Sequence, residues 1–450
     1  MPYGLSTGEV PHAGRGGAII DIVEYGAWTA SEKIEAGELT SEALVRACLE
    51  RIAAREGDVH AWSYIDPEAA MAVARACDRA PRRGPLHGIP IGIKDLIDSA
   101  DMPTTYGSRI YSGWRPKVDA SAITLLKRAG AIMLGKTVTQ AFGCGIPIEV
   151  NNGLNPDFTA GGSSSGSAAA VAARMVPLAL GSQSASSLIR PCSYNGVVGM
   201  RPSFGTMSLA GFKYFNGSFD SLGLIARSVD DIALLWQVQV GVELEKIVAS
   251  PPPRIGLCRS PWWKFAEPAS RQALEGAARV FKQSGAEVFD FELPSEFNDL
   301  HEAHKIMQAF EAAHAYAWEY DNHRDLLDES VLGIIDLGRK TTYPQYLALL
   351  RRAQPVRARF DALMQGVDAV VAPSAPGEPP PSRRVAGGGF VMGDPVMSRG
   401  WTLLHVPCIT LPHFTGPQGM PVGIQLIGAF GEDEKILSLA KWAEVSFARA

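Results

Sequence analysis

Two glycine- and serine-rich stretches hold the residues best suited to chemistry in this chain. Residues 161–167 are GGSSSGS and residues 181–187 are GSQSASS. The Ala-rich segment 168–174 between them favours a helix, and the serines before it can cap that helix. The apolar run 176–180 then predicts a short buried strand.

This helix and strand are expected to bring Ser163 and Ser187 to one edge of a sheet. A helix of about 11 residues rises roughly 16 Å, and a strand of about seven residues returns roughly 23 Å. Sites in open α/β sheets form beyond the C-terminal ends of the strands. Two serines placed there among backbone N–H donors suggest nucleophilic chemistry.

Lys94 is the candidate base for these serines. It lies near the end of HGIPIGIKD (87–95), an apolar segment that predicts a strand, where an exposed charge would not be expected. Burial lowers the pKa of a lysine and can leave it a neutral base, and Ser–Lys catalysis has precedent. Spacing alone leaves open a plainer interpretation, in which the lysine merely ends a strand beside small turn residues.

Other chemistries fit these residues less well. Residues 162–166 match G-x-S-x-G, but that motif needs a strand directly before it, and the preceding segment 151–161 predicts a loop. The same loop opens a helix, as an anion site would, but lacks the G-K-[ST] ending of a phosphate-binding loop. Ser438 and Lys441 fit S-x-x-K within an amphipathic helix, where a surface lysine is expected.

A metal site is the remaining alternative. One predicted helix carries several ligand types, namely His301, Glu302, His304, Glu311 and His314. Its H-E-x-H is one residue shorter than the H-E-x-x-H of zinc proteases, so the two histidines are not one turn apart. A polar helix face explains the pattern, and we expect no metal.

Composition limits the possible partners and compartments. The 450 residues carry a net charge of −5 without a basic block, which argues against nucleic acid. The longest apolar runs are strand-length, too short for a membrane span. Residues 1–18 lack the apolar core of a secretory signal and predict a flexible arm. Six scattered cysteines indicate reduced, mostly buried thiols and a cytoplasmic protein.

Alternating strand and helix patterns predict an α/β fold. We expect a single large domain over residues 19–450, with a mixed, mostly parallel sheet flanked by helices and a helical cap region at about 300–365. Predicted strands cover 87–95, 131–134, 176–180, 197–200, 254–258, 287–293, 369–373, 408–412 and 422–428. Predicted helices cover 120–129, 168–174, 229–240, 270–284 and 432–450, after a mostly helical start from 19 to about 80.

These motifs together resemble the amidase signature family. GIPIGIKD with Lys94, GGSSSGSAAAVAA with Ser163 and GSQSASSLIRP with Ser187 follow the family's order, and the serines are 24 residues apart. The likeness covers nearly the whole chain, and the ending SSLIRP and the segment WTLLHVPC (401–408) resemble its bacterial malonamidase branch.

The resemblance implies a Ser–cis-Ser–Lys triad with no cofactor. Ser187 would attack the carbonyl, Ser163 would relay the proton, and neutral Lys94 would be the general base. The backbone N–H groups of a four-residue loop would form the oxyanion hole, namely those of Ser184, Ala185, Ser186 and Ser187. The family usually has glycine where this chain has Ala185 or Ser186, which puts the geometry of that loop in question.

The expected substrate is a small carboxylated amide, an aryl amide or a carbamate (urethane). Arg190 matches the position that binds a substrate carboxylate in malonamidases, although it could instead brace the loop. Aromatic residues in loops beside the motifs could line an apolar pocket, or simply pack in the core, namely Tyr106, Tyr214, Phe215 and Phe219. Two alternatives remain: one component of an amidotransferase that feeds ammonia to a tRNA-linked aminoacyl group, and an inactive binding homologue. A homodimer is left open.

Overall fold

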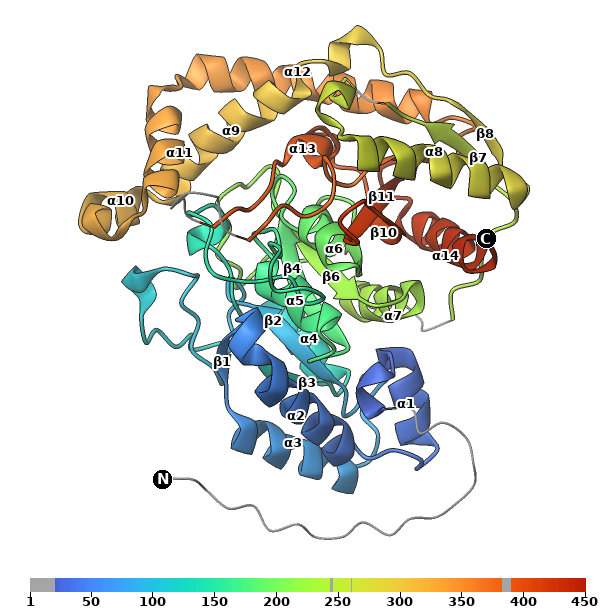
Figure 1. Ribbon diagram of the computed structural model, residues 1–450. Helices are drawn as coiled ribbons and strands as arrows, with labels where there is room; N and C mark the ends of the chain where they lie inside the picture. Colours follow the sequence, from blue (N-terminus) through green and yellow to red (C-terminus); the bar gives the residue numbers. More distant parts are fainter. Residues whose placement is uncertain (1–20, 243–245, 260, 383–389) are drawn as a thin grey trace.

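The structure, a computed structural model, describes residues 21–242, 246–259, 261–382 and 390–450. Within these ranges eleven strands form one mixed sheet in the order β1-β3-β2-β4-β6-β5-β10-β11-β9-β7-β8. The predicted α/β domain with a helix-flanked mixed sheet is confirmed (Figure 1). The arm predicted at residues 1–18 lies outside the described residues.

The elements follow the predicted alternation closely. The strands are β1 Trp62–Ile65, β2 Pro90–Lys94, β3 Ile132–Thr137, β4 Leu178–Gln183, β5 Val198–Arg201, β6 Ser221–Ala226, β7 Arg254–Leu257, β8 Glu287–Asp290, β9 Ala369–Pro373, β10 Cys408–Thr415 and β11 Pro421–Ile427. The helices are α1 Ala27–Glu35, α2 Ser41–Val59, α3 Pro67–Arg79, α4 Ser121–Arg128, α5 Ser165–Ala172, α6 Ile189–Asn195, α7 Val229–Val240, α8 Pro268–Gln283, α9 Leu300–Ala315, α10 Ala317–His323, α11 Glu329–Lys340, α12 Tyr343–Leu363, α13 Val396–Leu403 and α14 Asp433–Arg449.

The sheet is less parallel than the sequence predicted. Of the ten strand pairs in the described ranges, six are antiparallel and four are parallel. Parallel neighbours need a long crossover, whereas antiparallel neighbours accept a short turn or loop. The short turn between β10 and β11 and the loop between β5 and β6 reverse the chain, and both pairs are antiparallel. The expected predominance of parallel pairing is therefore corrected.

Helices cover both faces of the sheet. α5 packs against β2, β3, β4 and β6, and α6 packs against β5, β10 and β11, while α7, α8 and α14 cover strands of the other face. α9, α11 and α12 gather at the end of the molecule opposite α2 and α3 (Figure 1). A second apolar cluster joins α9, α12 and α13 around the fully buried Trp401.

The α5–β4 unit is packed closely enough to fix the serine loops beside it. Every residue of α5 is buried, and its small side chains let the helix approach β2, β3 and β4. A Cβ on Gly166 would come within 2.3 Å of the Ala61 carbonyl oxygen and 2.6 Å of the Val138 nitrogen. Only glycine leaves room for this approach, so the helix entrance that carries Ser163 is held tightly against the sheet.

Two further features concern the cysteines and the helices. The side chains of all six cysteines are buried, as the scattered pattern indicated. Among the described helices, none combines the length and apolarity needed to cross a membrane.

Candidate functional site

A buried lysine lies at the centre of the site. Lys94 ends β2, and its side chain has no exposed surface. Its Nζ lies 2.8 Å from Ser163 Oγ and 2.9 Å from Ser182 Oγ, with Ser164 Oγ at 3.1 Å. In the described part of the chain no carboxylate forms an ion pair with it. The amine is therefore surrounded by hydroxyl groups rather than neutralised by a counter-charge.

The environment of Lys94 favours its neutral form. Burial lowers the pKa of Lys94 from 10.5 to about 7, and the charge of Asp220 opposes only part of that shift. Desolvation penalises the ammonium because nothing replaces its hydration shell fully. A large fraction of Lys94 is therefore unprotonated near neutral pH and can accept a proton.

The hydrogen bonds around Lys94 also indicate a direction for proton transfer. The Ser164 hydroxyl donates to the Ser182 carbonyl and accepts from the Ser182 N–H, each at 3.1 Å. Its proton is thus engaged, so it accepts from Lys94. A neutral amine has two N–H donors and one lone pair. If these donors serve Ser164 and Ser182, the lone pair is left for the hydroxyl proton of Ser163.

The two serine loops meet directly. The Ser164 N–H donates to the Ser187 carbonyl at 3.0 Å, and the peptide bond between Gly162 and Ser163 is cis. Ser187 lines a cavity, while Ser163 lies toward Lys94. No hydrogen bond joins the Ser163 and Ser187 hydroxyls within the described residues. Such catalytic contacts are often long in a site without substrate.

The loop after β4 presents a row of backbone donors. All four of its residues line the cavity, and in the described ranges their N–H groups have no intramolecular acceptor, namely Ser184, Ala185, Ser186 and Ser187. Neither Ala185 nor Ser186 adopts a positive φ. The replacement of the family's glycine therefore carries no left-handed strain, because the loop avoids the conformation that would require glycine.

Three side chains from distant segments hold this loop in place. The Ser184 hydroxyl donates to Asp220, and the Ser184 carbonyl accepts a 2.7 Å hydrogen bond from Nε2 of His304 on α9. The Thr402 hydroxyl of α13 donates to the Ala185 carbonyl at 2.9 Å. Because each contact fixes a loop oxygen, the N–H groups between them have a defined direction.

Asp220 is the charged member of this support. Its carboxylate also accepts the N–H groups of Phe215 at 2.8 Å and Asn216 at 3.2 Å. Burial raises the pKa of Asp220 to about 6, although these hydrogen bonds and Lys94 favour its ionised form. Lys94 and Asp220 thus both have pKa values closer to neutral pH than usual, because burial lowers the pKa of the lysine and raises that of the carboxyl group.

The predicted substrate contacts divide into two sets. Arg190 and Phe215 line the same cavity as Ser187, which has a volume of about 220 Å³. Tyr214 is half exposed and lines a neighbouring hollow together with Phe215. Tyr106 packs in the core, where its hydroxyl donates to Asp98 at 2.8 Å. Phe219 is fully buried and stacks on His304.

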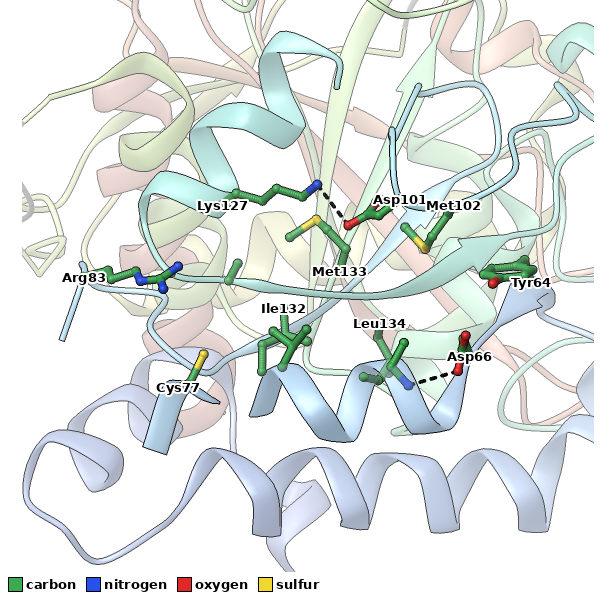
Figure 2. A pocket seen from close by; sticks show the side chains of 15 residues that line it. Tyr64, Asp66, Cys77, Arg83, Asp101, Met102, Lys127, Ile132, Met133 and Leu134 are labelled. Atoms are coloured by element: carbon green, nitrogen blue, oxygen red, sulfur yellow. Dashed lines mark hydrogen bonds and ion pairs between the residues drawn. The ribbon is translucent and has the colours of Figure 1, made fainter. Parts of the chain in front are cut away.

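A second hollow of about 360 Å³ lies between α3 and β3 (Figure 2). Three of its charged groups have partners: Lys127 pairs with Asp101 at 3.0 Å, and Asp66 accepts the Ala69 N–H at the start of α3. None of the predicted catalytic residues lines it. The cavity beside Ser187 is therefore the candidate active site.

Sequence reasoning missed the supporting residues. The sequence pattern indicated only a polar helix face for His304, yet this side chain is fully buried against the serine loop. No group of three or more metal-ligand side chains is found in the described residues. Asp220 lies in FDSLGLIARSVDD, a segment that resembles the family, and this is the signal that could have identified it.

Fold and site together define an α/β enzyme of the amidase class. The chain belongs to the amidase family, because the family's sequence model matches residues 43–437. It is similar to one subunit of the glutamyl-tRNA(Gln) amidotransferase of Chloroflexus aggregans, with 33% identity over 88% of this chain and 91% of the relative. The corresponding subunit from Lysinibacillus sphaericus is 31% identical over 93% of this chain and 96% of its own length.

Solved structures agree with this assignment. A structure described as an amidase superposes with a TM-score of 0.86 and 31% identity, covering 94% of this chain and 99% of that one. The peptide amidase of Stenotrophomonas maltophilia gives a TM-score of 0.80 and 27% identity over 94% and 97% of the two chains. These comparisons do not test the likeness to the malonamidase branch, which stays a prediction.

Proposed function

We propose that the protein hydrolyses the C–N bond of a small amide or carbamate through an acyl-enzyme on Ser187. The observation that carries this proposal is the buried Lys94, whose Nζ lies 2.8 Å from Ser163 Oγ and whose pKa is lowered to about 7. A lysine in this state is a base matched to neutral pH. No cofactor takes part in the proposed reaction.

The proposed proton route uses the existing contact between Lys94 and Ser163 and requires the Ser187 hydroxyl to approach Ser163 when substrate binds. As Ser187 Oγ bonds to the substrate carbonyl carbon, its proton passes to Ser163 Oγ, and the Ser163 proton passes to the Lys94 lone pair. Lys94 then returns a proton through Ser163 to the leaving nitrogen as the C–N bond breaks. Water then attacks the acyl-enzyme and gives a proton through Ser163 to Lys94. That proton returns through Ser163 to Ser187 Oγ as the acyl group leaves, which restores all three groups.

The loop from Ser184 to Ser187 would stabilise the negative charge on the carbonyl oxygen. Preorganised N–H donors are most effective when they need not reorient during the reaction. The contacts from Asp220, His304 and Thr402 provide that preorganisation. Because attack on a carbamate carbonyl needs the same groups, carbamates fall within the proposal.

A second candidate is a component of an amidotransferase, which the names of the two relatives above favour. Such a protein would release ammonia from an amide with the same serine and lysine groups, and would need partner proteins to use it. Turnover of simple amides by the isolated chain argues for the hydrolase. Amide turnover that appears only with added partner proteins argues for the amidotransferase.

Labelling with a fluorophosphonate tests the proposed nucleophile. Intact protein should be labelled on Ser187, and Ser187→Ala should lose both labelling and amide hydrolysis while remaining folded by circular dichroism. Lys94→Met should slow labelling strongly, because the neutral base is removed. Ser208→Ala, at an exposed serine, serves as the control. A folded wild-type protein that neither reacts nor turns over would instead indicate an inactive binding homologue.

A further inference from the structure

The cavity beside Ser187 is positively charged. Among the residues that line it, the charged side chains are Arg190 and Arg399, and within the described ranges no carboxylate lines it. Its volume of about 220 Å³ is below the roughly 300–1,000 Å³ of pockets that hold drug-sized ligands. The cavity is therefore suited to a small substrate that carries negative charge.

The two arginines differ in what they bind within the protein. Nη1 of Arg190 donates to the Gly393 carbonyl at 2.6 Å, and Nη2 donates to the Gly162 carbonyl. Gly162 directly precedes Ser163, so Arg190 braces the first serine loop. These contacts engage both terminal nitrogens, the pair that can bind a carboxylate side by side, and within the described residues leave only Nε of Arg190 without an acceptor.

Arg399 of α13 has no such partner. Within the described residues its guanidinium forms no hydrogen bond or ion pair, and its Nε is buried without an acceptor. Asp394 and Glu302 attract it only over a longer range. The Asp394 carboxylate instead accepts the Val396 N–H at 2.8 Å. A partly buried guanidinium without an acceptor is costly unless a ligand supplies one.

We propose that Arg399 binds a carboxylate group of the substrate and thereby selects short amides that carry a carboxylate. This inference rests on the proposed function, since the same cavity must hold the scissile carbonyl near Ser187. Gln308 lines the cavity too and offers a further polar contact. Arg190, whose two terminal nitrogens donate to backbone carbonyls, then acts as a positioning residue for the serine loop.

A pair of size-matched substrates tests the proposal. Wild-type protein should hydrolyse succinamate with a higher kcat/KM than butanamide. Arg399→Gln should lower kcat/KM for succinamate by roughly 10- to 150-fold, the range expected for losing a charged hydrogen bond. The same variant should change butanamide hydrolysis by less than about threefold, because the neutral amide makes no such bond. Arg359→Gln, at an exposed arginine of α12, is the control.

The outcomes separate the two proposals. Equal losses for both substrates in Arg399→Gln, or a wild-type preference for butanamide, would overturn the role of Arg399. Fluorophosphonate labelling of Ser187 should be unchanged in Arg399→Gln, which shows that the reactive centre is intact. If wild-type protein neither reacts with the probe nor hydrolyses either amide, the proposed function fails.

A binding measurement keeps the test independent of turnover and of one variant. Succinate should raise the melting temperature of the wild-type protein and should inhibit labelling of Ser187, whereas size-matched 1,4-butanediol should do neither. Arg399→Lys keeps the charge but loses the planar fork, so it should retain only part of the succinate effect. A succinate effect that is absent in wild type, or undiminished in both variants, contradicts the proposal.

Discussion

The pKa of Lys94 can be tested through the pH dependence of Ser187 labelling. The variable is the pH, and the measured quantity is the rate at which a fluorophosphonate probe labels Ser187. With this probe, ionisation of a substrate cannot affect the measured rate. Burial lowers the pKa of this lysine to about 7. Lysine is the active base only when unprotonated, so the rate should rise with pH through that value and then level off.

The size of the effect follows from the shift. With an ordinary pKa near 10.5, only about 3 in 10,000 lysines would be neutral at pH 7, whereas a pKa of about 7 makes roughly half of them neutral. Burial therefore increases the neutral fraction by a factor on the order of 1,000. At about 1.4 kcal/mol per pH unit, this shift lowers the stability of the fold by roughly 5 kcal/mol below about pH 7, and the cost disappears as the pH rises toward 10.5.

The assay compares labelling rates from about pH 5 to pH 10, with circular dichroism at each pH to confirm folding. Below about pH 6 the rate should rise about tenfold per pH unit, and above about pH 8 it should be flat. Lys94→Met should be slow at every pH and show no such rise. A wild-type rate that still climbs tenfold per unit above pH 9 would refute the lowered pKa of the lysine, since an ordinary lysine would behave so.

Other changes probe the support of the site. Asp220→Asn removes a charge that raises the pKa of Lys94, so the acid limb of the labelling profile should shift to lower pH; an upward shift would contradict the coupling. Thr402→Val deletes the hydroxyl that holds the Ala185 carbonyl, and we expect kcat to fall about tenfold with little change in KM. Gly166→Ala should lower the free energy of unfolding in urea by about 1–3 kcal/mol, because its Cβ would meet backbone atoms. Gly333→Ala, at a helix position where an added Cβ would meet nothing within 4 Å among the described residues, should instead raise that free energy by about 0.5–1 kcal/mol.

Local patterns predicted most of the elements that carry the site. The strand ending at Lys94 and the helix after the first serine loop lie where apolar runs and alanine content placed them. These features are encoded within a few residues of sequence. The short strand β1 was missed because its four residues, WSYI, follow a long helical pattern and show no clear alternation.

The contacts that support the site depend on tertiary structure. His304 lies 120 positions after Ser184, and Thr402 lies 217 positions after Ala185. Neither pair has a local signature, because the contacts arise only when α9 and α13 pack over the end of β4. The same reasoning explains Arg190, whose residue type suggested a carboxylate ligand but whose neighbours are backbone carbonyls.

The contact between His304 and the Ser184 carbonyl ties the helices after residue 300 to the serine loop. His304 also stacks on Phe219, with ring centroids 4.3 Å apart, next to Asp220. Exchanging these helices for those of a relative, as an engineer might do to alter substrate range, would thus also re-aim the N–H groups of the loop. Selectivity and turnover cannot be tuned separately in such chimeras unless the histidine and its stacking partner are transferred together.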